Sequence, residues 1–264
     1  MLFPISDDDR LLDRRAWVTV LLVVANVAVY AYQMANPAFT YAWSTVPYEV
    51  TAGVDVVNER PIPEEDPTAE IRTPLDIPQR PGPGGAPFIY LTVLTSMFMH
   101  GGLAHIGGNL LYLWIFGDNV EHRFGAGPFL LFYLVSGVAA SAAQIAIDPD
   151  GLVPTLGASG AISGVLGAYL VLFPRNRVYT VFLFQVIAVP AFAVLGLWIA
   201  LQFFNGFGAT AATEQTGGVA YGAHIGGFVA GMAMALVSRS VGVRERPSRL
   251  TQAMRDDRQG RPLW

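Results

Sequence analysis

The stretch AWVTVLLVVANVAVYAYQM, residues 16–34, contains no charged residue and is long enough to cross a membrane. A helix rises about 1.5 Å per residue, so about 20 apolar residues span the roughly 30 Å hydrocarbon core of a bilayer. The preceding residues, MLFPISDDDRLLDRR, are partly acidic, and no small-residue cleavage site follows at once. This pattern favours a retained helix over a cleaved signal peptide.

The composition indicates the same class of protein. Of the 264 residues, 53% are hydrophobic and 14% are charged, and the mean hydropathy is +0.43. A soluble domain carries about a quarter charged residues. The chain has no cysteine, which excludes disulfides, thiolate metal sites and a cysteine nucleophile. The net charge of −4 gives no indication of nucleic-acid binding.

Six apolar runs predict an all-α membrane domain over residues 16–238, after a cytoplasmic segment at 1–15. The fourth run is the shortest. A further apolar segment at 88–100, FIYLTVLTSMFMH, is too short for a span and either dips into the membrane or lies at its surface. The six expected spans cover about 16–34, 103–120, 127–147, 158–174, 178–205 and 218–238.

The arginines predict which way the chain faces. An even number of spans places both termini on one side, and that side would hold thirteen of the sixteen arginines, against three on the other side. Because cytoplasmic loops are enriched in basic residues, both termini are expected in the cytoplasm. This topology fits a multi-pass protein of a bacterial inner membrane.

Two polar segments differ in character. The first outer loop, 35–102, contains an acidic, proline-rich insert at about 55–86. Its composition predicts a flexible or extended segment, which is either a spacer or a functional element. The tail, 239–264, is polar and basic, and it is expected to be solvated or to lie on anionic lipid.

Polar side chains are costly inside a membrane and usually have a function there. In the expected spans they cluster toward the outer side. The set comprises His100, His105, Asn109, Ser159, Ser163 and His224. Asn109 follows His105 by four residues, so these two side chains share one face of a helix.

Small residues recur in the spans that carry Ser159 and His224. At four-residue spacing they are Gly160, Gly164 and Ala168 in one span, and the pairs Gly222 with Gly226 and Gly227 with Gly231 in the other. Such spacing lets two membrane helices approach closely, which would bring a serine hydroxyl within reach of an imidazole. The segment GASG, 157–160, would also leave N–H groups at a helix start, where they can stabilise an oxyanion.

Each of these features also has a purely structural interpretation. A serine in a membrane helix commonly bonds the carbonyl of residue i−4, and glycine repeats often serve packing alone. Three histidines could bind zinc, but no HExxH motif or neighbouring carboxylate supports a metal site. The segment is not the GxSxG motif of soluble hydrolases, because Ala161 takes the place of the last glycine.

Taken together, the motifs HGGLAHIGGN (100–109), GASG (157–160) and GAHIGG (222–227) resemble those of the rhomboid family of intramembrane serine proteases. The resemblance covers about residues 16–238 and includes the six spans, the short fourth span and the long first outer loop. It implies a rhomboid helix bundle that cleaves transmembrane segments of other membrane proteins near the outer face. It implies no cofactor, no metal and no nucleic acid.

The resemblance also implies roles for the matching residues. Ser159 corresponds to the nucleophile and His224 to its general base, in a dyad without an aspartate. His105, Asn109 and the backbone N–H of Ser159 correspond to the groups that hold the oxyanion. The supporting positions are His100, Gly157 and Gly160, and Glu121 with Gly125 matches a structural ExxxG motif.

Two features depart from the family pattern. Many members place an aromatic residue four positions after the serine, where it stacks on the histidine, but here that position is Ser163. Tyr221 or another ring would then have to support His224. The outer loop also lacks the Trp-Arg pair that some members carry.

The fifth expected span, 178–205, has Pro190 near its middle, and proline kinks a helix. In the family this span borders the substrate route, so the sequence predicts a mobile gate there. The main alternative function is a catalytically silent rhomboid-like protein that binds transmembrane helices, but such relatives typically lack the serine or the histidine. A transporter is less favoured, because no acidic residue lies deep in a span and no repeat of two halves is evident.

Overall fold

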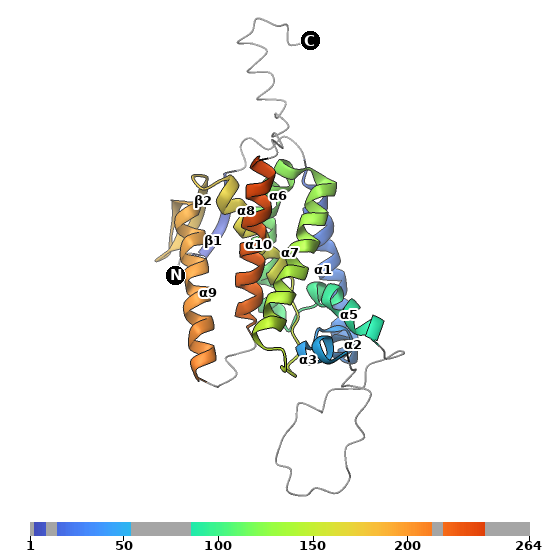
Figure 1. The fold of residues 1–264 in the computed structure, drawn as a ribbon. Helices are drawn as coiled ribbons and strands as arrows, with labels where there is room; N and C mark the ends of the chain where they lie inside the picture. The colour runs from blue at the N-terminus through green and yellow to red at the C-terminus, as the bar shows by residue number, and fades with distance from the viewer. Residues whose placement is uncertain (1–2, 9–14, 54–85, 213–218, 241–264) are drawn as a thin grey trace, which may run out of the picture.

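The computed structural model describes residues 3–8, 15–53, 86–212 and 219–240. Long helices run side by side as a bundle, and three short strands lie against one flank of it (Figure 1). The described helices are α1 (Trp17–Ala35), α2 (Pro37–Trp43), α3 (Pro47–Ala52), α5 (Ala86–Thr95), η1 (Ser96–Phe98), α6 (Leu103–Phe124), α7 (Ala126–Ile147), α8 (Ser159–Leu172), α9 (Ala191–Ala212) and α10 (Tyr221–Ser240). The strands are β1 (Phe3–Asp7), β2 (Arg177–Phe182) and β3 (Gln185–Pro190).

The helices differ in their capacity to cross a membrane. Among the described residues, α1, α7 and α10 are each long and apolar enough to span a bilayer. Phe88–Phe98 and Leu103–Phe124 meet this criterion together, but they are bent by 77° relative to each other. Ser159–Leu172 and Ala191–Gly206 are apolar but shorter. The predicted helical bundle is confirmed, and the number of six spans stays a prediction.

Helix α8 forms the centre of the bundle. Every residue from Gly160 to Tyr169 is buried, because α6, α7 and α10 pack around it. A helix that is apolar on all sides is one that neighbours enclose completely.

The backbones of α8 and α10 touch. A Cβ atom added to Gly231 would lie 1.9 Å from the carbonyl oxygen of Gly164, and one added to Gly227 would lie 2.0 Å from that of Gly160. No side chain fits at either position, so the close approach predicted from the glycine spacing is confirmed. By contrast, Gly226 faces α7, where a Cβ would meet that of Ala143 at 2.2 Å.

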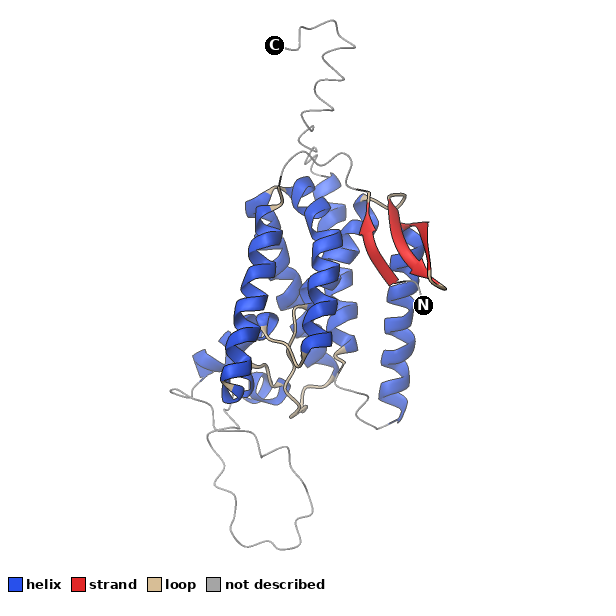
Figure 2. Ribbon diagram, turned by 180° about the vertical axis from the view of Figure 1, so that it is seen from behind, coloured by secondary structure: helices blue, strands red, loops and turns tan. Residues whose placement is uncertain are grey.

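Residues 177–190 form a β-hairpin, although the fifth span was expected to begin at 178. β2 pairs antiparallel with β3 and with β1, giving the strand order β1-β2-β3 (Figure 2). The segment is rich in Val, Ile, Thr, Tyr and Phe, which favour strands, and an apolar run alone does not distinguish a strand from a buried helix. Pro190 ends β3 and α9 begins at Ala191. The prediction that Pro190 kinks a spanning helix is therefore wrong.

Buried carboxylates join distant elements at the end of the bundle near the sheet. Asp7 of β1 accepts hydrogen bonds from Asn119 of α6, at 2.8 Å, and from the hydroxyl of Tyr169 of α8. Glu121 accepts the backbone N–H groups of Val18 and Thr19 at 3.0 and 2.7 Å. These two N–H groups belong to the first turn of α1, and the N–H groups of a first turn have no acceptor within their own helix. Glu121 is thus a remote cap of α1, in line with a structural role.

Two of the predicted segments fall outside the described residues. These are the acidic insert at about 55–86, apart from Ala86, and the basic tail at 239–264, apart from its first two residues. Their expected character, and the boundaries of the membrane domain, stay predictions.

Candidate active site

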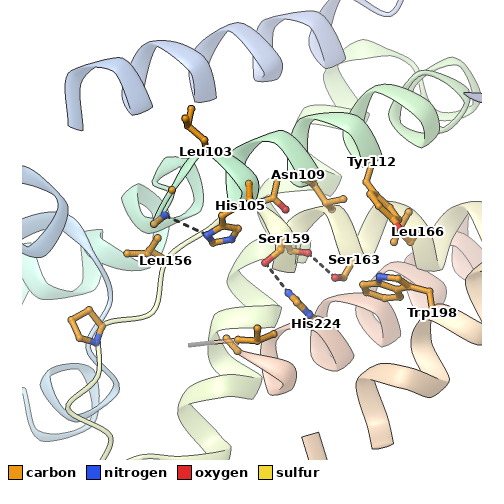
Figure 3. A pocket seen from close by; sticks show the side chains of 18 residues that line it. Leu103, His105, Asn109, Tyr112, Leu156, Ser159, Ser163, Leu166, Trp198 and His224 are labelled. Atoms are coloured by element: carbon orange, nitrogen blue, oxygen red, sulfur yellow. Dashed lines mark hydrogen bonds between the residues drawn. The ribbon is translucent and has the colours of Figure 1, made fainter. Parts of the chain in front are cut away.

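Ser159 and His224 face each other where α8 meets α10 (Figure 3). Ser159 is the first residue of α8, and His224 lies in the first turn of α10. The serine Oγ is 2.8 Å from the imidazole Nε2. This separation lies within the range over which a general base takes a proton from a hydroxyl. The distance depends on the glycine contacts described above, because they allow the two helices to touch.

A pocket of about 840 Å³ opens beside this pair. Most of its wall is apolar, and its polar atoms converge near the start of α8. The residues that supply them include His105, Asn109, Ser159, Ser163 and His224, with Trp198 alongside. In Figure 3, Ser159 lies between His224 on one side and His105 with Asn109, both from α6, on the other. The structure thus brings together four of the predicted site residues around one cavity.

Asn109 presents a buried side-chain N–H group that the described residues leave unpaired. Its exposed fraction is 7%, and its Nδ2 makes no hydrogen bond with the described residues. A buried donor without a partner is costly and uncommon in native proteins. Because Asn109 lines the pocket, this N–H group can be satisfied by an oxygen atom of a bound molecule.

The loop that precedes Ser159 is held in one conformation. Gly157 has a φ of +130°, and a Cβ atom there would lie 2.8 Å from Nε2 of His105. Its N–H donates to the carbonyl of Ser96 at 2.9 Å. Gly160 is equally restricted, because a Cβ there would lie 2.6 Å from that of Ala140 in α7. Both predicted glycine positions therefore exclude any larger residue.

His100 packs behind His105, which lines the pocket. Its side chain is 2% exposed, and its ring packs edge to face with that of His105, with centroids 5.2 Å apart. The backbone of His100 is fixed by Gln33 of α1, whose Oε1 accepts its N–H at 3.0 Å. His105 in turn accepts the N–H of Gly101 on its Nδ1 at 3.3 Å.

The His224 ring is supported from α9 as well as from its own helix. Tyr221 packs edge to face with it at 6.5 Å, and Trp198 lies closer, with centroids 5.9 Å apart and planes tilted by 39°. Oε1 of Gln202 is 2.8 Å from the histidine Nδ1. Ser163, in the position where an aromatic ring is common in the family, donates to the carbonyl of Ser159 at 2.6 Å.

Trp198 and Gln202 are not among the residues predicted from the sequence. A signal for Gln202 was present, because it is an amide within an otherwise apolar stretch, LWIALQFF, and such groups are costly in a membrane helix. No comparable signal existed for Trp198, since aromatic residues are common in membrane spans.

Comparisons with known proteins agree with the motifs. The Rhomboid domain model matches residues 88–240. The chain is similar to "Rhomboid protein 1, mitochondrial" of Saccharomyces cerevisiae, with 32% identity over 173 residues, which are 62% of this chain and 46% of that protein. It is also similar to "Rhomboid protease GluP" of Bacillus subtilis, with 45% identity over 85 residues, which are 32% of this chain and 16% of that protein. "Rhomboid protease GlpG" of Salmonella paratyphi A is 31% identical over 144 residues, which are 54% of this chain and 46% of that protein. The chain thus matches less than half the length of each of these relatives.

Proposed function

Because the chain belongs to the rhomboid family, we propose that it is an intramembrane serine endopeptidase that cleaves transmembrane segments of other membrane proteins. Family membership and its apolar helices make it an integral membrane protein. The observation that carries the proposal is the hydrogen-bond contact of 2.8 Å between Ser159 Oγ and His224 Nε2 at the edge of a pocket.

In the proposed reaction, His224 takes the proton of Ser159 as the serine Oγ attacks the carbonyl carbon of the scissile peptide bond. The resulting oxyanion accepts hydrogen bonds from Asn109, from His105 and from the backbone N–H of Ser159 at the start of α8. Such donors stabilise the transition state more than the ground state, because they are already in place before charge develops. His224 then protonates the leaving amine, and a water molecule releases the acyl-enzyme.

The reaction has two physical requirements, access of water to the serine and an exposed peptide bond in the substrate. Hydrolysis needs water, and non-helical backbone such as the segment before Ser159 is tolerated at membrane depth only where it lines a cavity or is buried in protein. The substrate must also expose a peptide bond, so its helix has to unwind locally. Helix-weakening residues near the scissile bond are therefore expected to favour cleavage.

We further propose that cleavage occurs near the outer face of a bacterial inner membrane, with both termini of the enzyme in the cytoplasm. The support is the excess of arginines in the segments assigned to the inner side. The alternative of a silent helix-binding relative is not favoured, because the serine and the histidine are both present and in contact.

Replacement of either dyad residue tests the proposal. Ser159→Ala and His224→Ala should each abolish cleavage of a transmembrane substrate in liposomes, because the nucleophile or its base is lost. Ser238→Ala and His122→Ala are matched controls, since their side chains bond to nearby backbone carbonyls within α10 and α6. Both controls should cleave at the wild-type rate. Cleavage by Ser159→Ala at the wild-type rate would refute the assignment.

A further inference from the structure

One side chain of α9 reaches the proposed base. Gln202 places its amide oxygen 2.8 Å from Nδ1 of His224, which is the ring nitrogen opposite the one that faces Ser159. The imidazole is therefore held at both nitrogens, by residues of two different helices. Gln202 is not among the residues that line the pocket.

The direction of this contact determines which nitrogen carries the proton. An amide oxygen only accepts hydrogen bonds, so Nδ1 must be the protonated nitrogen of the neutral ring. Nε2 is then left with a lone pair directed at the hydroxyl of Ser159. In the opposite tautomer Nε2 would donate to the serine and could not remove its proton. The partner of one ring nitrogen thus sets the function of the other.

The buried side chains of α9 lie near its start, beside the β-hairpin. In the part of α9 whose side chains are described, 191–206, the buried residues are Ala191, Val194 and Leu195, all in its first two turns. Its first N–H groups donate to the carbonyls of Asn176 and Pro174, which anchors this end beside the β-hairpin. From Gly196 to Gly206 every side chain is half-buried or exposed. Gln202 lies in this less buried part, which faces α10 through Trp198 and Gln202.

We propose that Gln202 is a positioning residue that holds His224 in its base-competent tautomer, and that it does so only while α9 lies against α10. This inference rests on the proposed function. If α9 separated from α10, the oxygen would leave Nδ1 and the ring would lose the contact that orients it.

Two substitutions at residue 202 separate this role from simple packing. Gln202→Met keeps the length of the side chain but removes the acceptor. It should lower the rate of Ser159 labelling by a small fluorophosphonate about ten- to a hundredfold, as expected for a base that is present but poorly oriented. In cleavage of a transmembrane substrate, kcat should fall by a similar factor while KM stays within about twofold, because Gln202 is not among the residues that line the pocket.

Gln202→Glu should restore the labelling rate, because a carboxylate also accepts the Nδ1 proton. It should also move the acid limb of the pH–rate profile upward by about one unit or more, since a negative charge beside the ring stabilises the protonated form, which cannot act as a base. A side chain that only packed against the ring would keep the wild-type rate in Gln202→Met and would leave nothing for Gln202→Glu to restore. Asn205→Leu, an exposed polar position on the same helix, is the matched control and should change neither rate nor profile.

The outcomes distinguish the two proposals. If wild-type protein labels and cleaves while Ser159→Ala does neither, the proposed protease function stands. In that setting, wild-type rates for Gln202→Met at every pH would overturn the role of Gln202, and so would an unshifted profile for Gln202→Glu. A change of KM alone in Gln202→Met would overturn it as well. If the wild-type protein neither labels nor cleaves, the proposed function itself fails.

Discussion

Asn109 is the residue whose loss should affect the reaction without affecting the fold. Its buried Nδ2 has no partner among the described residues, so Asn109→Ala removes no hydrogen bond that stabilises them. We expect kcat to fall about 10²- to 10³-fold, equivalent to roughly 3–4 kcal/mol of transition-state stabilisation, with KM little changed. Steady-state cleavage in liposomes measures both constants.

The thermal midpoint of Asn109→Ala in detergent serves as the control for this variant. It should stay within a few degrees of the wild-type value, because the variant loses no internal contact of the amide. A wild-type kcat in a correctly folded Asn109→Ala protein would exclude this side chain from the oxyanion site.

Residue types in an unusual setting were predictable, and so was the glycine contact between α8 and α10, but the contacts made by α9 were not. Histidine, asparagine and serine in apolar runs pointed to the residues that now surround the pocket, because polar groups in a membrane are costly. The contact of Gln202 with His224 depends on how α9 lies against α10, which spacing along one helix does not reveal. The same holds for Trp198, which supplies the ring that Ser163 does not.

At the scale of the element, the contact between α8 and α10 controls the geometry of the dyad. A Cβ on Gly231 would lie 1.9 Å from a backbone oxygen of α8, so Gly231→Ala must push the two helices apart. We expect a loss of stability of about 1–3 kcal/mol, as for overpacked cores, and loss of most cleavage activity because the serine and histidine separate. A thermal unfolding curve and a fluorophosphonate labelling assay measure the two effects.

Gly127→Ala provides the comparison, because a Cβ at that position meets nothing within 4 Å. It should unfold and react like the wild-type protein. If Gly231→Ala were as stable and as reactive as Gly127→Ala, the backbone contact would not be what sets the dyad.

The β-hairpin shows where element prediction failed. Five helices begin and end within a few residues of the expected spans, since long apolar runs define them well. The hairpin carries no turn signal in the sequence. Its two turn residues have positive φ values, for which Asn-Gly is the usual choice, but here they are Leu183, with a φ of 47°, and Phe184, with a φ of 67°. With large apolar residues at the turn, two strands and the following helix read as one long hydrophobic segment.

For the whole molecule, the orientation in the membrane is the property to test. The end of α10 and the connection from α7 to α8 lie at opposite ends of the bundle (Figure 1). The chain has no cysteine of its own, so Ser240→Cys and Asp150→Cys each introduce one exposed thiol. In intact cells, a membrane-impermeant maleimide should label Asp150→Cys, and Ser240→Cys should react only after lysis. The reverse pattern would place the termini outside and contradict the count of arginines.

The strand order β1-β2-β3 also fixes a sequence of events during synthesis. Phe3 pairs with Val181, so the first strand leaves the ribosome long before its partner exists. A nascent chain that ends at Leu172 contains the serine helix but no strand to pair with β1. Contacts so distant along the chain form late and slowly, and an unpaired strand edge can pair wrongly in the meantime. The N-terminal strand therefore joins the molecule after most of its helices have been made. It can pair only once the hairpin has been translated.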